Sequence, residues 1–159
     1  MATNKLLIDE VNRFTVSELR VSYHPKMRAF DRAMITRSSD AYPLFLNNWD
    51  LDAIYMVEHS HLMLLNRSNR VLGIIPLSVG GVSYTIVDPK VVFRYAIAGG
   101  ATAIMIAHNH PTCILTPSKN DEMMTSKIKE GGKLLDITLM DHLIISPEGY
   151  LSMADEGFL

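Results

Sequence analysis

The sequence predicts one α/β domain with three layers, α/β/α, in which helices cover both faces of a mixed sheet. The main observation is an alternation along the chain. Short apolar runs with the composition of strands are interrupted by stretches in which apolar residues recur at helical spacing. The chain has 159 residues, 48% of them hydrophobic and 20% charged, which is ordinary for a globular domain and sufficient for a buried core.

The N-terminal segment, residues 1–57, is expected to pack on the same domain and to supply a strand and a short helix. The run from Thr15 to Tyr23 alternates only partly between apolar and polar residues, which indicates an edge or irregular strand. Ser38 or Ser39 is expected to cap a short helix that ends near Trp49.

Two apolar runs in the middle of the chain, residues 53–65 and 70–81, are expected to pair as strands. The residues between them, Asn66-Arg67-Ser68-Asn69, have the composition of a hairpin turn.

The second half of the chain contains the remaining predicted elements, each with a start or stop signal. They are a helix opened by Asp88-Pro89 and stopped by Gly99-Gly100, a strand over residues 102–108 that is buried on both faces, a helix capped by Ser118 and closed by Gly131-Gly132, and strands over residues 134–146 and 149–153.

Composition limits the classes of function. The formal net charge is −2, so the overall charge does not favour nucleic acid, although basic residues crowd the first quarter of the chain. That crowding is typical of a solvated face, and contact with a polyanion stays as the alternative. Cys113 is the only cysteine, which excludes an internal disulfide and a Cys-rich zinc module. No signal peptide or membrane-spanning run is evident, so a cytoplasmic location without a membrane partner is expected.

A metal-binding pattern follows the buried strand. His108 and His110 lie where the chain leaves the sheet, so both imidazoles can lean to one side. Asp121 lies one turn inside the next helix, where the helix dipole favours a carboxylate that can face back towards the loop. Zinc accepts two nitrogens and one oxygen and keeps a fourth place for water, which is the pattern of a catalytic site.

Two further residues suit the chemistry of such a site. Glu58 is an ionisable residue within an apolar run, and it could carry a proton between the attacking water and the leaving group. Ser118 could donate its hydroxyl to the oxyanion of a tetrahedral intermediate, and it could also serve only as the helix cap.

Taken together, Glu58, His108-x-His110 and Ser118-x-x-Asp121 resemble the JAMM (MPN+) metalloprotease motif. The run HNHPTCILTPSKND, residues 108–121, resembles the bacterial RadC family more closely, since its members carry HNHPSG followed by PS-x-x-D. The resemblance extends from Glu58 to the end of the chain.

This resemblance implies a JAMM fold related to the cytidine deaminase architecture. It implies zinc (Zn²⁺) held by His108, His110 and Asp121, with Glu58 as acid/base and Ser118 as oxyanion support. Residues 58–159 would then be the catalytic domain. The helix-hairpin-helix segment of longer RadC proteins is expected to be absent, since residues 1–57 have no clear match.

Several neighbouring residues have competing interpretations. Cys113 stands where the family has glycine, and we expect a small loop residue there, with an extra metal ligand as the alternative. His59 and His61 alternate with Glu58 and are expected at the surface or at a partner contact. His142 is expected to form a buried hydrogen-bonded pair with Asp141, with catalysis as the alternative.

The leading functional hypothesis is a zinc metallohydrolase that cuts an amide or isopeptide bond in a peptide substrate. The alternative, suggested by the DNA-repair label attached to the RadC family, is a DNA-associated or partner-binding protein that uses the same fold without catalysis. Nucleobase deamination fails on the ligands, because those enzymes use His/Cys/Cys or three cysteines. The sequence specifies neither the substrate nor the oligomeric state.

Overall fold

The computed structural model describes residues 17–18, 20–81 and 87–159. Its centre is a five-stranded sheet with the order β2-β1-β3-β4-β5. Strands β3 and β4 run parallel and the other neighbouring pairs are antiparallel, so the sheet is mixed. The elements in chain order are a 3₁₀ turn (Ala29–Asp31), α1 (Ser38–Leu46), β1 (His59–Leu65), β2 (Val71–Val79), α2 (Pro89–Ala98), β3 (Ala103–Asn109), α3 (Lys119–Leu134), β4 (Thr138–Ser146) and β5 (Gly149–Ser152).

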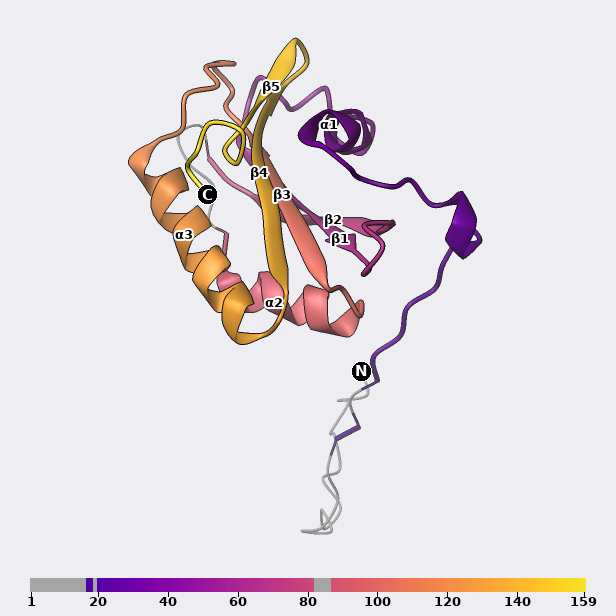
Figure 1. The fold of residues 1–159 in the computed structure, drawn as a ribbon. Coiled ribbons are helices and arrows are strands. Elements are labelled where there is room, and N and C mark those ends of the chain that lie inside the picture. The colour runs from indigo at the N-terminus through magenta and orange to yellow at the C-terminus, as the bar shows by residue number, and fades with distance from the viewer. Residues whose placement is uncertain (1–16, 19, 82–86) are drawn as a thin grey trace, which may run out of the picture.

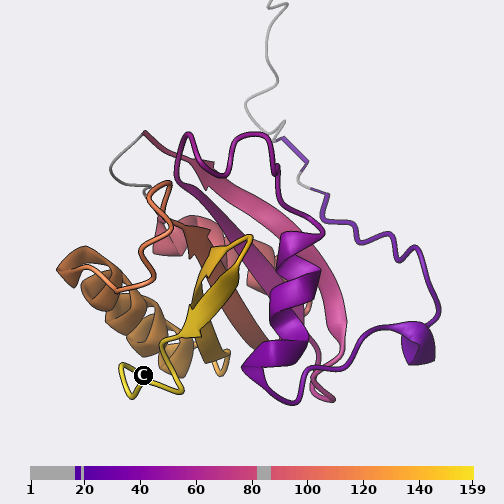
Figure 2. The same cartoon turned by 90° about the horizontal axis from the view of Figure 1, so that it is seen from above.

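Helices cover both faces of the sheet, which confirms the predicted three-layer α/β/α class. Helix α1 lies on one side, and α2 and α3 lie on the other (Figures 1 and 2). Strands β1 and β3 are buried along their whole length, because alternate residues point into the two layers between sheet and helices. None of the described helices is long and apolar enough to cross a membrane.

Each layer has its own apolar core. The core on the α1 side joins Phe45 to alternate residues of the central strands, such as Met63 and Met105. The core on the other side joins Phe93 of α2 and Ile128 of α3 to the intervening strand residues, among them Leu62, Ile104 and Ile106. Strands β1 and β3 are thus packed against apolar side chains on both faces of the sheet.

The crossover from β3 through α3 to β4 matters most for function. Because β3 and β4 are parallel, the chain must return along the sheet between them, and α3 makes that return on the face it shares with α2. The loop from β3 to α3 therefore holds the carboxyl end of the central strand close to the first turn of α3.

Two predicted helix boundaries need correction, namely the C-terminal end of α3 and the N-cap of α1. Helix α3 does not end at Gly131-Gly132 but continues to Leu134. Both glycines serve close packing, since a Cβ on Gly131 would lie 2.7 Å from the Phe93 ring and one on Gly132 would collide with the carbonyl oxygen of Ile137.

Helix α1 is capped differently from the prediction. Its N-cap position is Arg37 rather than Ser38 or Ser39, and the helix ends at Leu46, before Trp49. The backbone N–H of Arg37 donates to the carboxylate of Asp40, in the first turn of the helix, at 3.2 Å.

The N-terminal part of the prediction is only half correct. Of the strand expected from Thr15 to Tyr23, residues 15, 16 and 19 lie outside the described residues, and the described remainder is exposed and forms no strand. Tyr23 instead donates its hydroxyl proton to the carbonyl of Leu72 on edge strand β2, at 2.6 Å. The short helix, α1, does pack on the sheet as expected.

The predicted hairpin is confirmed, with a later start. Strand β1 begins at His59, since residues 51–56 form turns, and it pairs antiparallel with β2. The α2 helix is capped as predicted, because the Asp88 carboxylate accepts from the N–H of Lys90 at 2.9 Å.

Candidate metal centre

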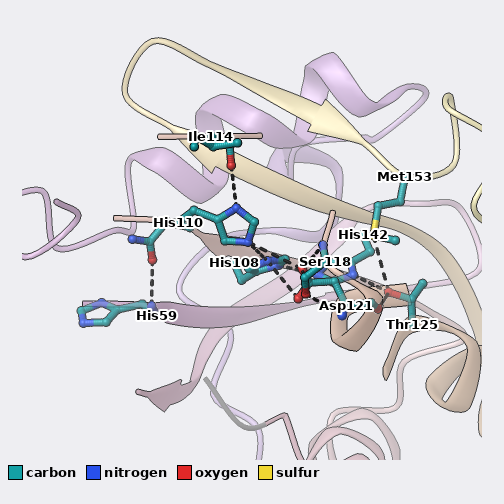
Figure 3. Close-up of polar contacts among 10 residues, drawn as sticks. His59, His108, His110, Ile114, Ser118, Asp121, Thr125, His142 and Met153 are labelled. Carbon is teal, nitrogen blue, oxygen red and sulfur yellow. Dashed lines mark hydrogen bonds and ion pairs between the residues drawn. The ribbon is translucent and has the colours of Figure 1, made fainter. Parts of the chain in front are cut away.

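Three side chains from β3, the following loop and α3 converge at the carboxyl end of β3. They are His108, His110 and Asp121, and their donor atoms all lie within 4.8 Å of one another. His108 is buried at 2% exposure, while the other two are partly accessible from solvent. Figure 3 shows the two imidazoles and the carboxylate pointing to a common centre.

The first turn of α3 fixes the carboxylate. Asp121 Oδ2 accepts from the Ser118 N–H at 2.7 Å and from the Ser118 hydroxyl at 2.6 Å, and the Asp121 N–H donates to Ser118 Oγ at 3.2 Å. This reciprocal capping box confirms Ser118 as the helix cap. It leaves Asp121 Oδ1 directed at His108.

A backbone carbonyl sets the tautomer of His110. Its Nδ1 lies 2.6 Å from the carbonyl oxygen of Ile114. Because a carbonyl only accepts, Nδ1 must carry the proton, and in the neutral ring Nε2 is left with a lone pair. That lone pair faces His108 Nε2 at 3.0 Å.

The centre gathers electron-rich atoms that need a cation. Asp121 Oδ1 lies 3.3 Å from His108 Nε2, and Asp121 Oδ2 lies 3.6 Å from His110 Nε2. The Asp121 carboxylate, which accepts a hydrogen bond from the protonated ring, raises the pKa of His110 despite burial. Burial alone would raise the pKa of Asp121, but the imidazoles of His108 and His110 when protonated, together with the hydrogen bond from Ser118, hold it well below its usual range. The carboxylate therefore stays ionised.

The donor spacing fits a tetrahedral zinc ion. Donors held at about 2.0–2.1 Å from such an ion lie about 3.3–3.4 Å apart. His108 Nε2 lies 3.0 Å from His110 Nε2 and 3.3 Å from Asp121 Oδ1, which is close to that value, and the other carboxylate oxygen, Oδ2, lies 3.6 Å from His110 Nε2. Two imidazole nitrogens and one carboxylate oxygen are also a donor set that zinc accepts.

Glu58 lies on the face of the sheet that carries His108. Ser60 pairs with His108 across β1 and β3, and residues two apart on a strand share a face, so Glu58 points the same way. Glu58 is buried, with 8% of its surface exposed. The Glu58 carboxylate is also close enough to contribute to the raised pKa of His110.

Asn109 ties the backbone around Glu58 to the metal-binding strand, a role that the sequence analysis missed. Its Oδ1 accepts from the N–H of His59 at 2.7 Å, and its Nδ2 donates to the carbonyls of Ile54 and Val57 at 2.6 and 3.0 Å. Both chain neighbours of Glu58 are thereby fixed to β3. The signal in the sequence was the place of Asn109 between the two histidines.

The expectation that His59 and His61 lie at the surface is wrong. They are 7% and 6% exposed and pack against Trp49, with ring centroids 6.4 and 4.0 Å from the indole. Both point to the side of β1 away from Glu58, as predicted, but α1 and the turn after it cover that side.

His142 is buried as predicted, but its ring has a different partner. The Asp141 carboxylate accepts from the backbone N–H of His142 at 2.7 Å, whereas the His142 ring contacts His108. Cys113 is partly buried and is not part of the metal-ligand group that the described residues form. Its φ of 58° is a conformation that glycine adopts more easily.

Comparison with known proteins identifies the family of the chain. The family described as RadC-like JAB domain matches residues 35–158. A UPF0758 protein of Flavobacterium johnsoniae is 44% identical over 100 residues, which cover 63% of this chain and 44% of that protein. A UPF0758 protein of Listeria monocytogenes is 40% identical over 106 residues, covering 67% of this chain and 47% of that protein, and one of Rubrobacter xylanophilus is 39% identical over 102 residues, covering 64% and 44%.

The aligned part thus spans less than half the length of these curated relatives. The family match, in contrast, covers most of the chain, from α1 to β5, including all three residues that converge at the centre. The chain therefore belongs to the RadC-like JAB domain family.

Proposed function

We propose that this chain is a metal-dependent hydrolase that uses zinc to cut an amide or isopeptide bond in a peptide substrate. One observation carries the proposal. Two imidazole nitrogens and an ionised carboxylate converge within 4.8 Å of one another, with a buried glutamate on the same face of the sheet.

His108, His110 and Asp121 would hold the ion. When bound, zinc lowers the pKa of a coordinated water to about 7 and polarises a carbonyl oxygen. Because His110 and Asp121 are only partly buried, a substrate carbonyl can approach from their side.

Glu58 would move the proton. Its carboxylate accepts a proton from the attacking water and returns it to the leaving nitrogen, so that the amine departs in neutral form. Asn109 supports this role by fixing the backbone on both sides of Glu58.

Ser118 would have a conditional role. Its single hydroxyl proton is directed to Asp121 Oδ2 at 2.6 Å. To donate to a developing oxyanion, the hydroxyl must rotate away from that carboxylate, which its position at the start of α3 allows without loss of the backbone cap bond.

The test replaces the proton carrier alone. Zinc-loaded wild type and Glu58→Gln are incubated with internally quenched peptides that contain either a linear amide or a lysine isopeptide bond. We expect Glu58→Gln to lose at least about 100-fold in rate, as for removal of a general acid/base, with unchanged zinc content. Glu130→Gln, which removes an exposed carboxylate on α3, is the matched control.

Two results would contradict the proposal. One is hydrolysis by Glu58→Gln at the wild-type rate. The other is a wild type that carries zinc but cuts neither class of peptide while it binds DNA with a steep salt dependence, which would favour the DNA-associated alternative. The structure gives that alternative little support, because basic residues such as Arg28 and Arg37 pair with Asp31 and Asp40.

A further inference from the structure

A buried row of three side chains leads from α3 to the metal centre. Thr125, His142 and His108 are 1%, 0% and 2% exposed. Thr125 Oγ1 lies 2.6 Å from His142 Nδ1, and His142 Nε2 lies 2.7 Å from His108 Nδ1 (Figure 3). His142 thus contacts Thr125 through Nδ1 and His108 through Nε2. His108 contacts His142 through Nδ1, and its own Nε2 faces His110 and Asp121.

The direction of these hydrogen bonds follows from one backbone carbonyl. Thr125 Oγ1 also lies 2.6 Å from the carbonyl oxygen of Asp121, one helical turn earlier. A carbonyl cannot donate, so the single hydroxyl proton of Thr125 is directed to it. The other neighbour, Met153 Sδ, lies 3.6 Å away and is a weak acceptor.

The remaining protons are then determined in sequence. Because the Thr125 proton is committed, Oγ1 must accept from His142, which places the His142 proton on Nδ1. His142 Nε2 therefore carries a lone pair and accepts from His108 Nδ1. In the neutral ring of His108, Nε2 is left with the lone pair that faces Asp121 and His110.

The geometry points to Thr125 and His142 as positioning residues that fix His108 in the tautomer whose Nε2 can bind a metal ion. The reverse direction of the row would put a proton on His108 Nε2 and block it. The row starts at the backbone of Asp121 and ends at the ring of His108, so it also couples two of the three ligands. The consequence for metal affinity rests on the proposed function, whereas the tautomer does not.

The tautomer is measured directly by long-range ¹H–¹⁵N correlation spectra of protein labelled with ¹⁵N-histidine. In wild type at pH 8, with and without zinc, His108 and His142 should each show a protonated Nδ1 and an unprotonated Nε2. A proton on Nε2 of His108 in the metal-free protein would overturn the inference, and this measurement needs no variant.

Two substitutions at one position separate the hydroxyl from packing. Thr125→Val keeps the side-chain shape and removes the hydroxyl, whereas Thr125→Ser keeps the hydroxyl and removes a methyl group. In Thr125→Val the His142 proton should move towards Nε2 and the His108 proton towards its own Nε2, and the Kd for zinc should rise about 10–100-fold, as for loss of other groups that orient a histidine ligand. Thr125→Ser should keep the wild-type tautomer and a Kd within about threefold of wild type.

These results separate the inference from the proposed function. If Thr125→Val keeps the wild-type tautomer and affinity, the positioning role of Thr125 and His142 is refuted while the hydrolase proposal stands. If wild type shows the expected tautomer but hydrolyses no peptide, the proposed function fails while the positioning role stands.

Discussion

Acidification should destabilise the metal-free protein through His61. The ring is 6% exposed, packs against Trp49 and has a buried Nδ1 without a hydrogen-bond partner among the described residues. Burial, with a smaller contribution from the charge of His59, lowers the pKa of His61 from 6.5 to about 4. The folded state therefore resists a proton that the unfolded chain accepts.

The size and sign of the effect follow from that difference in pKa. The pKa of His61 is lower in the folded state than in the unfolded chain. Its contribution to the free energy of unfolding is therefore fully present above pH 6.5 and is lost as the pH falls towards 4. At pH 5 the unfolded ring is almost fully protonated and the folded ring only about one tenth, which corresponds to about 2 kcal/mol. Allowing for slight solvent screening, we expect a loss of about 1–2 kcal/mol between pH 8 and pH 5.

The assay is urea unfolding in EDTA at both pH values, followed by circular dichroism and by the fluorescence of Trp49, the single tryptophan. Each protein is compared with itself at pH 8 and pH 5, so other histidines cancel between wild type and variant. His61→Phe keeps a ring against Trp49 and cannot titrate, so its loss of unfolding free energy should be smaller by about 1–2 kcal/mol. His61→Leu is a second variant in case the phenyl ring overpacks the site. Equal losses in wild type and both variants would refute the reasoning.

Other substitutions test backbone conformation and packing elsewhere in the domain by the same unfolding assay at pH 8. At φ 58° Cys113→Val should be less stable than Cys113→Gly by about 1–2 kcal/mol, and equal stabilities would contradict the strain argument. Gly132→Ala should lower the free energy of unfolding by about 1–3 kcal/mol, because the added Cβ meets the backbone of Ile137. Gly131→Ala should lower it less, because the added Cβ meets the side chain of Phe93, which can move. The reverse order would be inconsistent with the packing. Asn109→Ala should cost about 2–4 kcal/mol, because it leaves a backbone N–H and two carbonyls without their partner; a loss below about 1 kcal/mol would show that these bonds are dispensable.

Local signals explain why much of the site was predictable. The buried run before His108 and the Ser118 cap lie within short stretches whose hydrogen bonds close locally. Because a parallel crossover brings the end of β3 to the start of α3, the spacing of His108, His110 and Asp121 was sufficient to predict their convergence.

Tertiary contacts explain what was not predictable. Gly131 and Gly132 suit a helix stop, but close approach of Phe93 and Ile137 keeps them inside α3. The alternation that places His61 opposite Glu58 was correct, yet only the packing of α1 shows that this side is also buried.

The partner of the His142 ring depended on strand register. His142 pairs with Ile106 across β3 and β4, and Ile106 lies two residues before His108, so His142 and His108 share a face of the sheet. That register, and the approach of Thr125 from α3, arise only when sheet and helix are assembled, so nothing in the local sequence indicated the row from Thr125 through His142 to His108.

Metal content tests the central claim most directly. Protein without an affinity tag is loaded with zinc, dialysed, and analysed by mass spectrometry for metal per chain, with circular dichroism to confirm folding. We expect a single zinc ion per wild-type chain, little or none in His108→Ala, His110→Ala and Asp121→Ala, and an unchanged content in His24→Ala, which alters an exposed histidine. A wild type that retains no zinc, or ligand variants that retain as much as wild type, would contradict the account.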